Sequence, residues 1–166
     1  VGSSGTAVNI AARLGHIGAV RALIASGVRL DDRFNKRYVL ADALQAQADD
    51  IVQVLLESGA KWPAAPGDMQ GYLQDSIEAG SEALVASMLA YGVNPNGEYW
   101  PGTMLGIAVE PGRAGMVRLL LQAGADPSLT NKRGVSPLMI AAVLNRVDLM
   151  QMLLDAGFRH IFIGIE

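Results

Sequence analysis

The sequence contains no cysteine, few aromatic residues and little excess charge of either sign. Without cysteine, disulfides and thiolate metal sites are excluded, although this absence favours no particular compartment. Aromatic residues make up 5% of the chain and hydrophobic residues 51%, so the core must be built mainly from Ala, Leu, Val and Ile. Such a composition favours helices. The net charge of -3 lacks the basic excess that is typical of a nucleic-acid-binding domain.

Long apolar segments and the common catalytic motifs are also missing. No apolar run approaches the length of a membrane-spanning helix, and the first residues, VGSSG, predict no signal peptide. The sequence contains no phosphate-binding loop, HExxH motif or nucleophile elbow. Asp49 and Asp50 are adjacent, but at the start of an expected helix they favour helix stabilisation over catalysis. His16 and His160 lie far apart in the chain, so we expect no metal site.

A five-fold internal repeat is the main feature that is present. A glycine follows a Leu-rich segment every 32 or 33 residues, at Gly27, Gly59, Gly92, Gly124 and Gly157. The apolar residues before each glycine have the i, i+3, i+4 spacing of one helix face. Each glycine is therefore predicted to end a helix in the left-handed conformation.

A second set of positions repeats ahead of these segments. An apolar residue in each expected first helix is followed three positions later by a small residue: Ala11, Ala43, Ser76, Ala108 and Ala141. The turn between the two helices holds residues that tolerate positive φ, namely Gly15, Gly80, Gly112 and Asn145, and Gln47 breaks this pattern. Ser136 followed by Pro137 predicts a helix start. Each repeat thus predicts two helices and a loop, stacked on neighbouring repeats.

On these residues, the chain resembles the ankyrin-repeat family. The matching segments are TAVNIAARLGH and VRALIASG in the first repeat, TMLGIAV and VRLLLQAGADP in the fourth, and NKRGVSPLMIAA and MQMLLDAG in the fifth. The resemblance implies an all-α solenoid of stacked helix-turn-helix units with hairpin-like loops. It predicts a single domain over residues 1–166, with repeats at approximately 4–33, 34–66, 67–98, 99–131 and 132–161. The histidine of the family's Thr-Pro-Leu-His motif is replaced by Asn9, Ala41, Gln74, Gly106 and Met139, so its hydrogen bonds must be lost or remade.

The resemblance also implies a non-catalytic module that binds another protein, without a cofactor or metal, and not a nucleic acid or a membrane. Finger-like loops and the first helix of each pair would line a concave groove. Tyr99 and Trp100 are the leading candidates, because such side chains often anchor interfaces; alternatively, they cover the base of their own loop. Trp62 is expected to be structural. The other candidate partner-binding residues are Phe34, Asn35, Arg37, Glu78, Glu110, Lys132 and Arg133.

Two further functions stay open: an inhibitory, immunity or secreted effector protein that occludes a partner enzyme, and a regulatory segment of a larger protein. We expect a monomer, with a cytoplasmic location favoured and secretion as an effector left open. The final residues are unusually apolar, and we expect them to fold over the last helix pair as a cap. Continuation of the array in a longer chain, or contact with a second copy, are the alternatives. These apolar residues are Phe158, Ile161, Phe162, Ile163 and Ile165.

Overall fold

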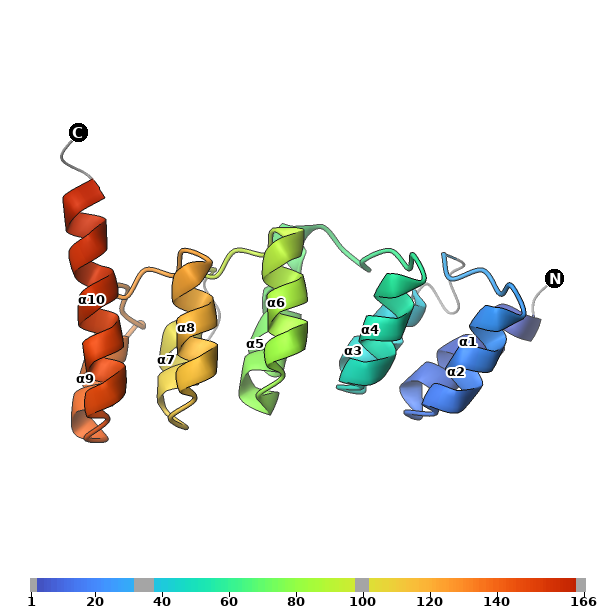
Figure 1. Ribbon diagram of the computed structural model, residues 1–166, viewed down its shortest axis with the longest axis horizontal. Helices are drawn as coiled ribbons and strands as arrows, with labels where there is room; N and C mark the ends of the chain where they lie inside the picture. Colours follow the sequence, from blue (N-terminus) through green and yellow to red (C-terminus); the bar gives the residue numbers. More distant parts are fainter. Residues whose placement is uncertain (1–2, 32–37, 98–101, 164–166) are drawn as a thin grey trace. The chain divides into compact units, whose positions relative to one another are not determined.

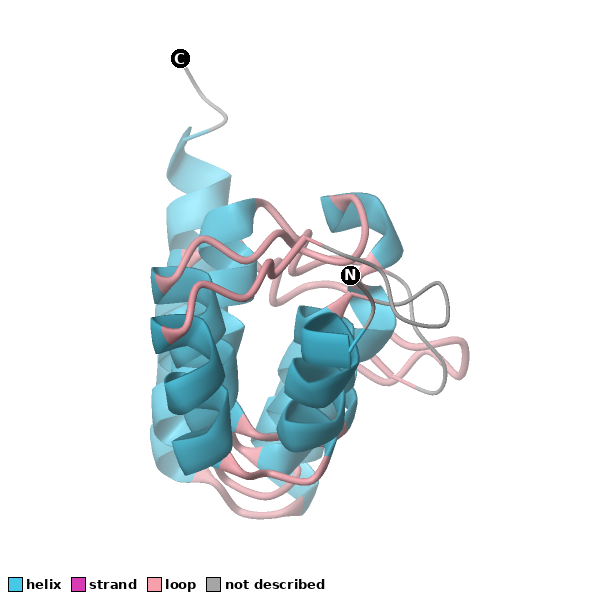
Figure 2. Ribbon diagram, turned by 90° about the vertical axis from the view of Figure 1, so that its right-hand side faces the viewer, coloured by secondary structure: helices cyan, strands magenta, loops and turns pink. Residues whose placement is uncertain are grey.

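The computed structural model describes the backbone of residues 3–31, 38–97 and 102–163, and within these the side chains of residues 7–157. This described part consists of helices and loops and contains no strand, as Figure 2 shows. The chain divides into two compact units, Val1–Ala65 and Pro66–Glu166. A single domain over the whole chain stays a prediction.

The first unit contains two helix pairs. The first pair is α1 (Ser3–Arg13) and α2 (Ile17–Ala25), and the second is α3 (Val39–Gln45) and α4 (Asp49–Glu57). Within the unit α1 packs against α3 and α2 against α4, so first and second helices form two separate layers (Figures 1 and 2). The side chains between these layers are almost completely buried, among them Val8, Val20, Leu40, Val52 and Leu55.

The second unit contains three helix pairs after a short 3-10 turn, η1 (Pro66–Asp68). The pairs are α5 (Gln70–Ala79) with α6 (Glu82–Tyr91), α7 (Met104–Val109) with α8 (Ala114–Gln122), and α9 (Pro137–Val143) with α10 (Val147–Ile163). Here α5, α7 and α9 form one layer, and α6, α8 and α10 form the other (Figure 1). Its buried core includes Leu73, Met88, Leu105, Met116 and Leu120.

The predicted repeat of helix, turn and helix is confirmed, and the expected turn residues Gly15, Gly80, Gly112 and Asn145 have positive φ. The glycines expected after the second helices adopt positive φ at Gly27, Gly59, Gly92 and Gly124. The prediction for Gly157 is wrong, because α10 continues through it to Ile163. Gln47 breaks the sequence pattern but not the structure, since its backbone has a φ of 51°. The small residues of the first helices are all buried, as expected from close helix packing.

Two first helices of the second unit begin with a side-chain cap. The hydroxyl of Ser136 accepts a hydrogen bond from the backbone N–H of Met139 at 3.2 Å, and Pro137 occupies the first turn, as predicted. Thr103 plays the same part for α7, because its Oγ1 accepts from the N–H of Gly106 at 3.0 Å. These bonds satisfy amides that have no partner within the helix.

Polar contacts link the repeats of the first unit. Asn9 stands where the family has its histidine, and its Nδ2 donates to Asp42 Oδ2 of the next repeat at 2.6 Å, with both residues buried. The lost histidine contact is therefore remade here in another form. At the loops, Lys61 Nζ lies 2.9 Å from Asp31 Oδ2, and the Asp31 carboxylate raises the pKa of Lys61.

Side chains also join the loops of the second unit. The side chain of Asn96 behaves like an extra peptide group: its Nδ2 donates to the carbonyl of Gly124 at 2.9 Å, and its Oδ1 accepts from the N–H of Asp126 at 2.7 Å. These two bonds tie the loop after α6 to the loop after α8. Asp126 then orders its own loop by accepting from the N–H of Ser128 at 2.8 Å.

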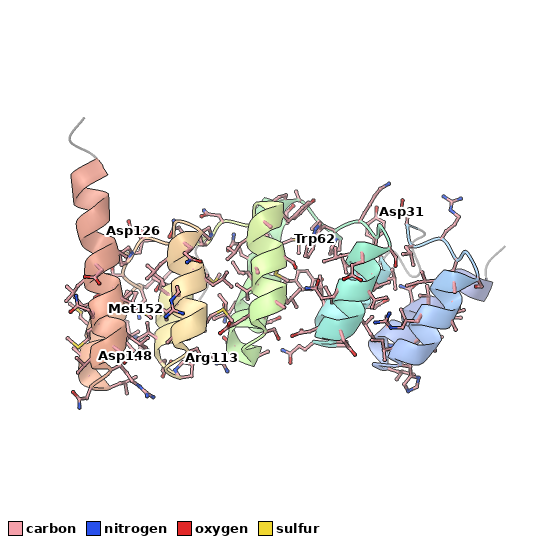
Figure 3. The ribbon with its side chains drawn as sticks, viewed as in Figure 1. Asp31, Trp62, Arg113, Asp126, Asp148 and Met152 are labelled. Atoms are coloured by element: carbon pink, nitrogen blue, oxygen red, sulfur yellow. The ribbon has the colours of Figure 1, made fainter. Side chains whose placement is uncertain are left out.

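Arginines connect the helix-helix turns at the opposite end of the second unit. Arg113, labelled in Figure 3, donates from Nη1 to the carbonyl of Ile77 in the preceding repeat. Its guanidinium covers the turn there, since a Cβ built at Gly80 would lie 3.1 Å from Arg113 Cζ. Arg146 covers the next turn in the same way, 2.8 Å from a Cβ built at Gly112. Positive φ favours glycine at both turns, whereas the flexible arginine side chains could shift to make room for a Cβ.

The last helix pair exposes apolar side chains. Met139 is 54% exposed, whereas the residues at the equivalent positions, Asn9, Ala41, Gln74 and Gly106, are buried. In the second unit the next repeat covers this position, because a Cβ at Gly106 would lie 3.2 Å from Ile140 Cδ1. The expectation that the tail folds back over this pair is not met by the backbone, since residues 158–163 extend α10 (Figure 1).

Candidate protein-binding surface

Two consecutive exposed residues lie at, or directly after, the C-terminal end of each first helix. The residue just before them is buried in the first four repeats: Ala12, Leu44, Ile77 and Val109. The exposed pairs therefore stand at the boundary of the core, at equivalent positions in all five repeats. They are Arg13 and Leu14, Gln45 and Ala46, Glu78 and Ala79, Glu110 and Pro111, and Val143 and Leu144.

In the second unit three of these pairs form one row, which we call the helix-end row: residues 78–79, 110–111 and 143–144. The row results from packing, because α5 lies against α7 and α7 against α9. Packed helices are about 8–10 Å apart, so neighbouring pairs of the row have roughly that spacing. Glu78 and Glu110, both predicted binding residues, thus belong to one continuous exposed feature.

The first part of the helix-end row is acidic. Glu78 and Glu110 are exposed, and Glu78 Oε1 accepts a hydrogen bond from Gln74 Nε2 at 2.6 Å. This bond holds the Glu78 carboxylate in place on α5. Gln74 is 7% exposed, and its own Oε1 accepts no hydrogen bond from any described residue. An unused acceptor therefore lies in the side chain that holds Glu78.

The end of the row at α9 is apolar. Val143 is 85% exposed and Leu144 is 42% exposed, and exposed Met139 and Val147 lie on the same helix pair. A single exposed apolar residue is ordinary, but several together on one helix pair are typical of an interaction site. The helix-end row therefore changes along the second unit from negative charge to apolar surface.

Most of the loop residues expected to bind a partner lie outside the described residues. These are Phe34, Asn35, Arg37, Tyr99 and Trp100. Of the remaining loop candidates, Lys132 and Arg133 are exposed at the tip of a tight hairpin, in which the N–H of Asn131 donates to the carbonyl of Val135 at 3.0 Å. Asn131 Oδ1 accepts from the N–H of Arg133 at 2.9 Å, which fixes this tip. All seven stay predictions as binding residues.

Gln74 and Arg113 are the residues around this surface that sequence reasoning does not assign to it. In the sequence Gln74 stands out only as a replacement of the family's histidine, and its spacing of four from Glu78 is the signal that could have joined them on one helix face. Arg113 directly follows the turn residue Gly112. Its contact with the preceding repeat depends on how closely the two pairs stack, which the sequence does not specify.

The carboxylates considered for catalysis have structural surroundings. Asp49 and Asp50 lie in the first turn of α4, and Asp50 Oδ1 accepts from the N–H of Ile51 at 2.8 Å. This agrees with the predicted structural role at a helix start. Within the described part of the chain, no three of His, Cys, Asp or Glu come together in a group suited to a metal ion. The helices found there are all too short or too polar to cross a membrane.

The repeat geometry is matched by a family model described as ankyrin repeats (3 copies), over residues 73–161. The chain belongs to the ankyrin-repeat family. The predicted fold class and family are thereby confirmed, and ankyrin repeats generally mediate binding to other proteins. Members of the family are typically not catalytic.

Individual relatives are identical to this chain at about one aligned residue in three. An L-asparaginase of Dirofilaria immitis is 30% identical over 147 residues, which are 87% of this chain and 25% of the relative. Protein PhlB of Serratia liquefaciens is 34% identical over 121 residues, 71% of this chain and 53% of that protein. A putative ankyrin repeat-containing protein of Treponema pallidum is 30% identical over 112 residues, 65% of this chain and 37% of that protein. The chain thus spans between a quarter and about half of these relatives.

Proposed function

We propose that this chain is a non-catalytic module that binds a partner protein through its helix-end row and its loops. The observation that carries the proposal is the helix-end row itself: residues at equivalent positions of α5, α7 and α9 are exposed together above a buried core. Stacking holds the helices that carry these side chains in place before binding, so little backbone entropy is lost when a partner docks. The loop residues Tyr99 and Trp100 remain candidate anchors.

Affinity capture with matched variants tests this proposal. We would compare the unaltered chain with a row variant, Glu78→Ala/Glu110→Ala/Val143→Ser, and a loop variant, Tyr99→Ala/Trp100→Ala. The control is Arg118→Ala/Gln122→Ala, which alters exposed residues of α8 in the other helix layer. Each lost anchor should weaken binding by about 2 kcal/mol if it is a hot spot.

The expected result is a protein that quantitative mass spectrometry finds with the unaltered chain and the control but not with the row variant. Loss with the loop variant as well would add Tyr99 and Trp100 to the surface. Equal recovery of the same proteins by all four chains would contradict a role for both the row and the loop.

A role as a regulatory segment of a larger protein is the second candidate. The comparisons favour it, because the matching region is only 25% of the L-asparaginase relative and 37% of the Treponema protein. In that case the partner of the helix-end row would be another domain of the same polypeptide. Expression of the complete gene product, followed by cross-linking of the row, distinguishes this from an intermolecular partner. An inhibitory or secreted effector role has no comparable observation in its favour.

A further inference from the structure

We infer that the partner presents an extended segment with two cationic residues followed, in line, by apolar ones. This inference rests on the proposed binding function and names the chemistry of the partner at the helix-end row. Three features of the second unit carry it: the charge distribution, the free acceptor of Gln74, and the apolar residues at α9.

The sequence segment that carries the first two pairs of the row is acidic, and two arginines from later repeats lie close to it. From residue 62 to residue 112 the sequence has six acidic residues and no Lys, Arg or His. Arg113 and Arg146 reach back toward this end of the repeats, but they lie against the backbone at Ile77 and Gly112. Neither arginine forms an ion pair with Glu78 or Glu110, all four being described residues. Both carboxylates can therefore attract a cation from outside.

The side-chain amide of Gln74 adds a second, independent indication of a donor-rich partner. Its Nε2 is used by Glu78, and its buried Oε1 accepts no hydrogen bond within the described part of the chain. The equivalent Asn9 in the first unit bonds to Asp42 of the next repeat, but the residue that corresponds to Asp42 here is Ile107, which has no polar side chain. A guanidinium carries several N–H donors and can bind a carboxylate and a carbonyl oxygen together. The Gln74 oxygen is buried, so the Gln74 side chain has to shift before a guanidinium at Glu78 can reach it.

The apolar pair at α9 determines the character of the segment beyond its two cations. Val143 and Leu144 occupy the positions that Glu78 and Ala79 occupy in α5, and both are exposed. A segment that is cationic throughout would leave these two side chains in water, whereas an apolar end would bury them. The row therefore matches a segment whose character changes from cationic to apolar in the same order.

The spacing of the row predicts the spacing within the segment. Stacked helices lie about 8–10 Å apart, and an extended chain advances roughly 3.3–3.6 Å per residue. One repeat thus corresponds to roughly three residues of the partner. The expected pattern is Arg-x-x-Arg-x-x-Leu, with Lys able to replace Arg and with either chain direction, since the row alone does not define polarity.

A random linear peptide library displayed on phage, selected on the full chain, tests the inference. Counter-selection uses the chain with Glu78→Gln, Glu110→Gln, Val143→Ser and Leu144→Ser, all at exposed positions. We expect enrichment of two cationic residues three apart, followed by apolar ones. A peptide from the selection, labelled for fluorescence polarisation, should bind Glu78→Gln/Glu110→Gln about fivefold more weakly and Val143→Ser/Leu144→Ser about tenfold more weakly.

The matched control is Asp68→Asn/Asp155→Asn, which removes the same charge from two exposed residues of the second unit that lie outside the row. It should change binding by less than about twofold, because surface charges away from the contact are screened by salt. Enriched peptides without paired cations, no enrichment over the counter-selected chain, or an equal loss with the control would overturn the inference. If row-dependent capture of a protein persists in that case, the proposed function stands without this partner chemistry. If the row variant captures the same proteins as the unaltered chain, the proposed binding function of the row is wrong as well.

Discussion

At the scale of single residues, Gln47 shows that position in the repeat outweighs residue preference. Its φ of 51° is close to that of Asn145 at the same position of the last repeat, which is 52°. This conformation costs an L residue other than Gly, Asn or Asp about 1–2 kcal/mol. The flanking helices α3 and α4 impose it, because both can pack only if the chain reverses at this turn.

We therefore expect Gln47→Gly to stabilise the protein. Relief of backbone strain is partly offset by the greater freedom of glycine in the unfolded chain, which leaves a net gain of about 0.5–1 kcal/mol. The midpoint of urea denaturation measures it. Asn145→Gly is the matched control and should change stability by less than about 0.3 kcal/mol, since Asn tolerates positive φ. A lower midpoint for Gln47→Gly would show that its side chain makes a contact worth more than the strain.

At the scale of elements, the short first helices of the second unit depend on their caps. Helix α7 (Met104–Val109) has six residues and α9 (Pro137–Val143) has seven, so neither helix is stable alone. A hydrogen bond to one of the free N–H groups at the helix start therefore adds noticeably to stability. Thr103→Ala and Ser136→Ala should each cost about 1 kcal/mol in thermal or urea unfolding.

Ser81 provides the control for these two caps. It also occupies an N-cap position, before α6, but its side chain makes no capping hydrogen bond. Ser81→Ala should therefore change stability by less than about 0.3 kcal/mol. Equal losses at all three positions would mean that the hydroxyls act through something other than the capping bond.

Caps and turns are the elements that the sequence predicts best, because they depend on local chemistry. Ser136 with Pro137, and the glycines at 27, 59, 92 and 124, have the conformations that their residue types favour. The contacts of Asn96 with Gly124 and Asp126 were not predicted, since they join residues about one repeat apart. Of the helix-end row, Glu78 and Glu110 were predicted from the sequence as binding residues, whereas the unpaired oxygen of Gln74 could be recognised only from the structure.

At the scale of the whole molecule, the last helix pair is the least covered part that the structure describes. On α10, Val147 is 67% exposed and Leu154 is 38% exposed. Deletion of residues 158–166 would also shorten α10, which runs to Ile163. We expect the shortened chain to aggregate and to melt at a lower temperature than the full chain, as measured by light scattering and circular dichroism.

Polar substitutions in the shortened chain show whether it aggregates because of exposed apolar surface or because the shorter α10 makes it less stable. If exposed apolar surface drives aggregation, adding Val147→Ser and Leu154→Gln to the deletion should restore solubility without restoring the melting temperature. A shortened chain that stays monomeric with unchanged melting would show that the tail neither covers nor stabilises the final pair.

The arginine contacts of the second unit have a consequence for how this protein can evolve. Arg113 and Arg146 each bind or cover a turn of the repeat that comes earlier in the chain. The DNA that encodes a repeat therefore also encodes its attachment to the preceding one. Duplication of such a segment would bring a ready-made junction into the gene, provided that the earlier turn keeps its glycine. Duplication of the fourth or fifth repeat would thus keep this contact, whereas the first three repeats have His16, Ala48 and Ser81 at the position of the arginine.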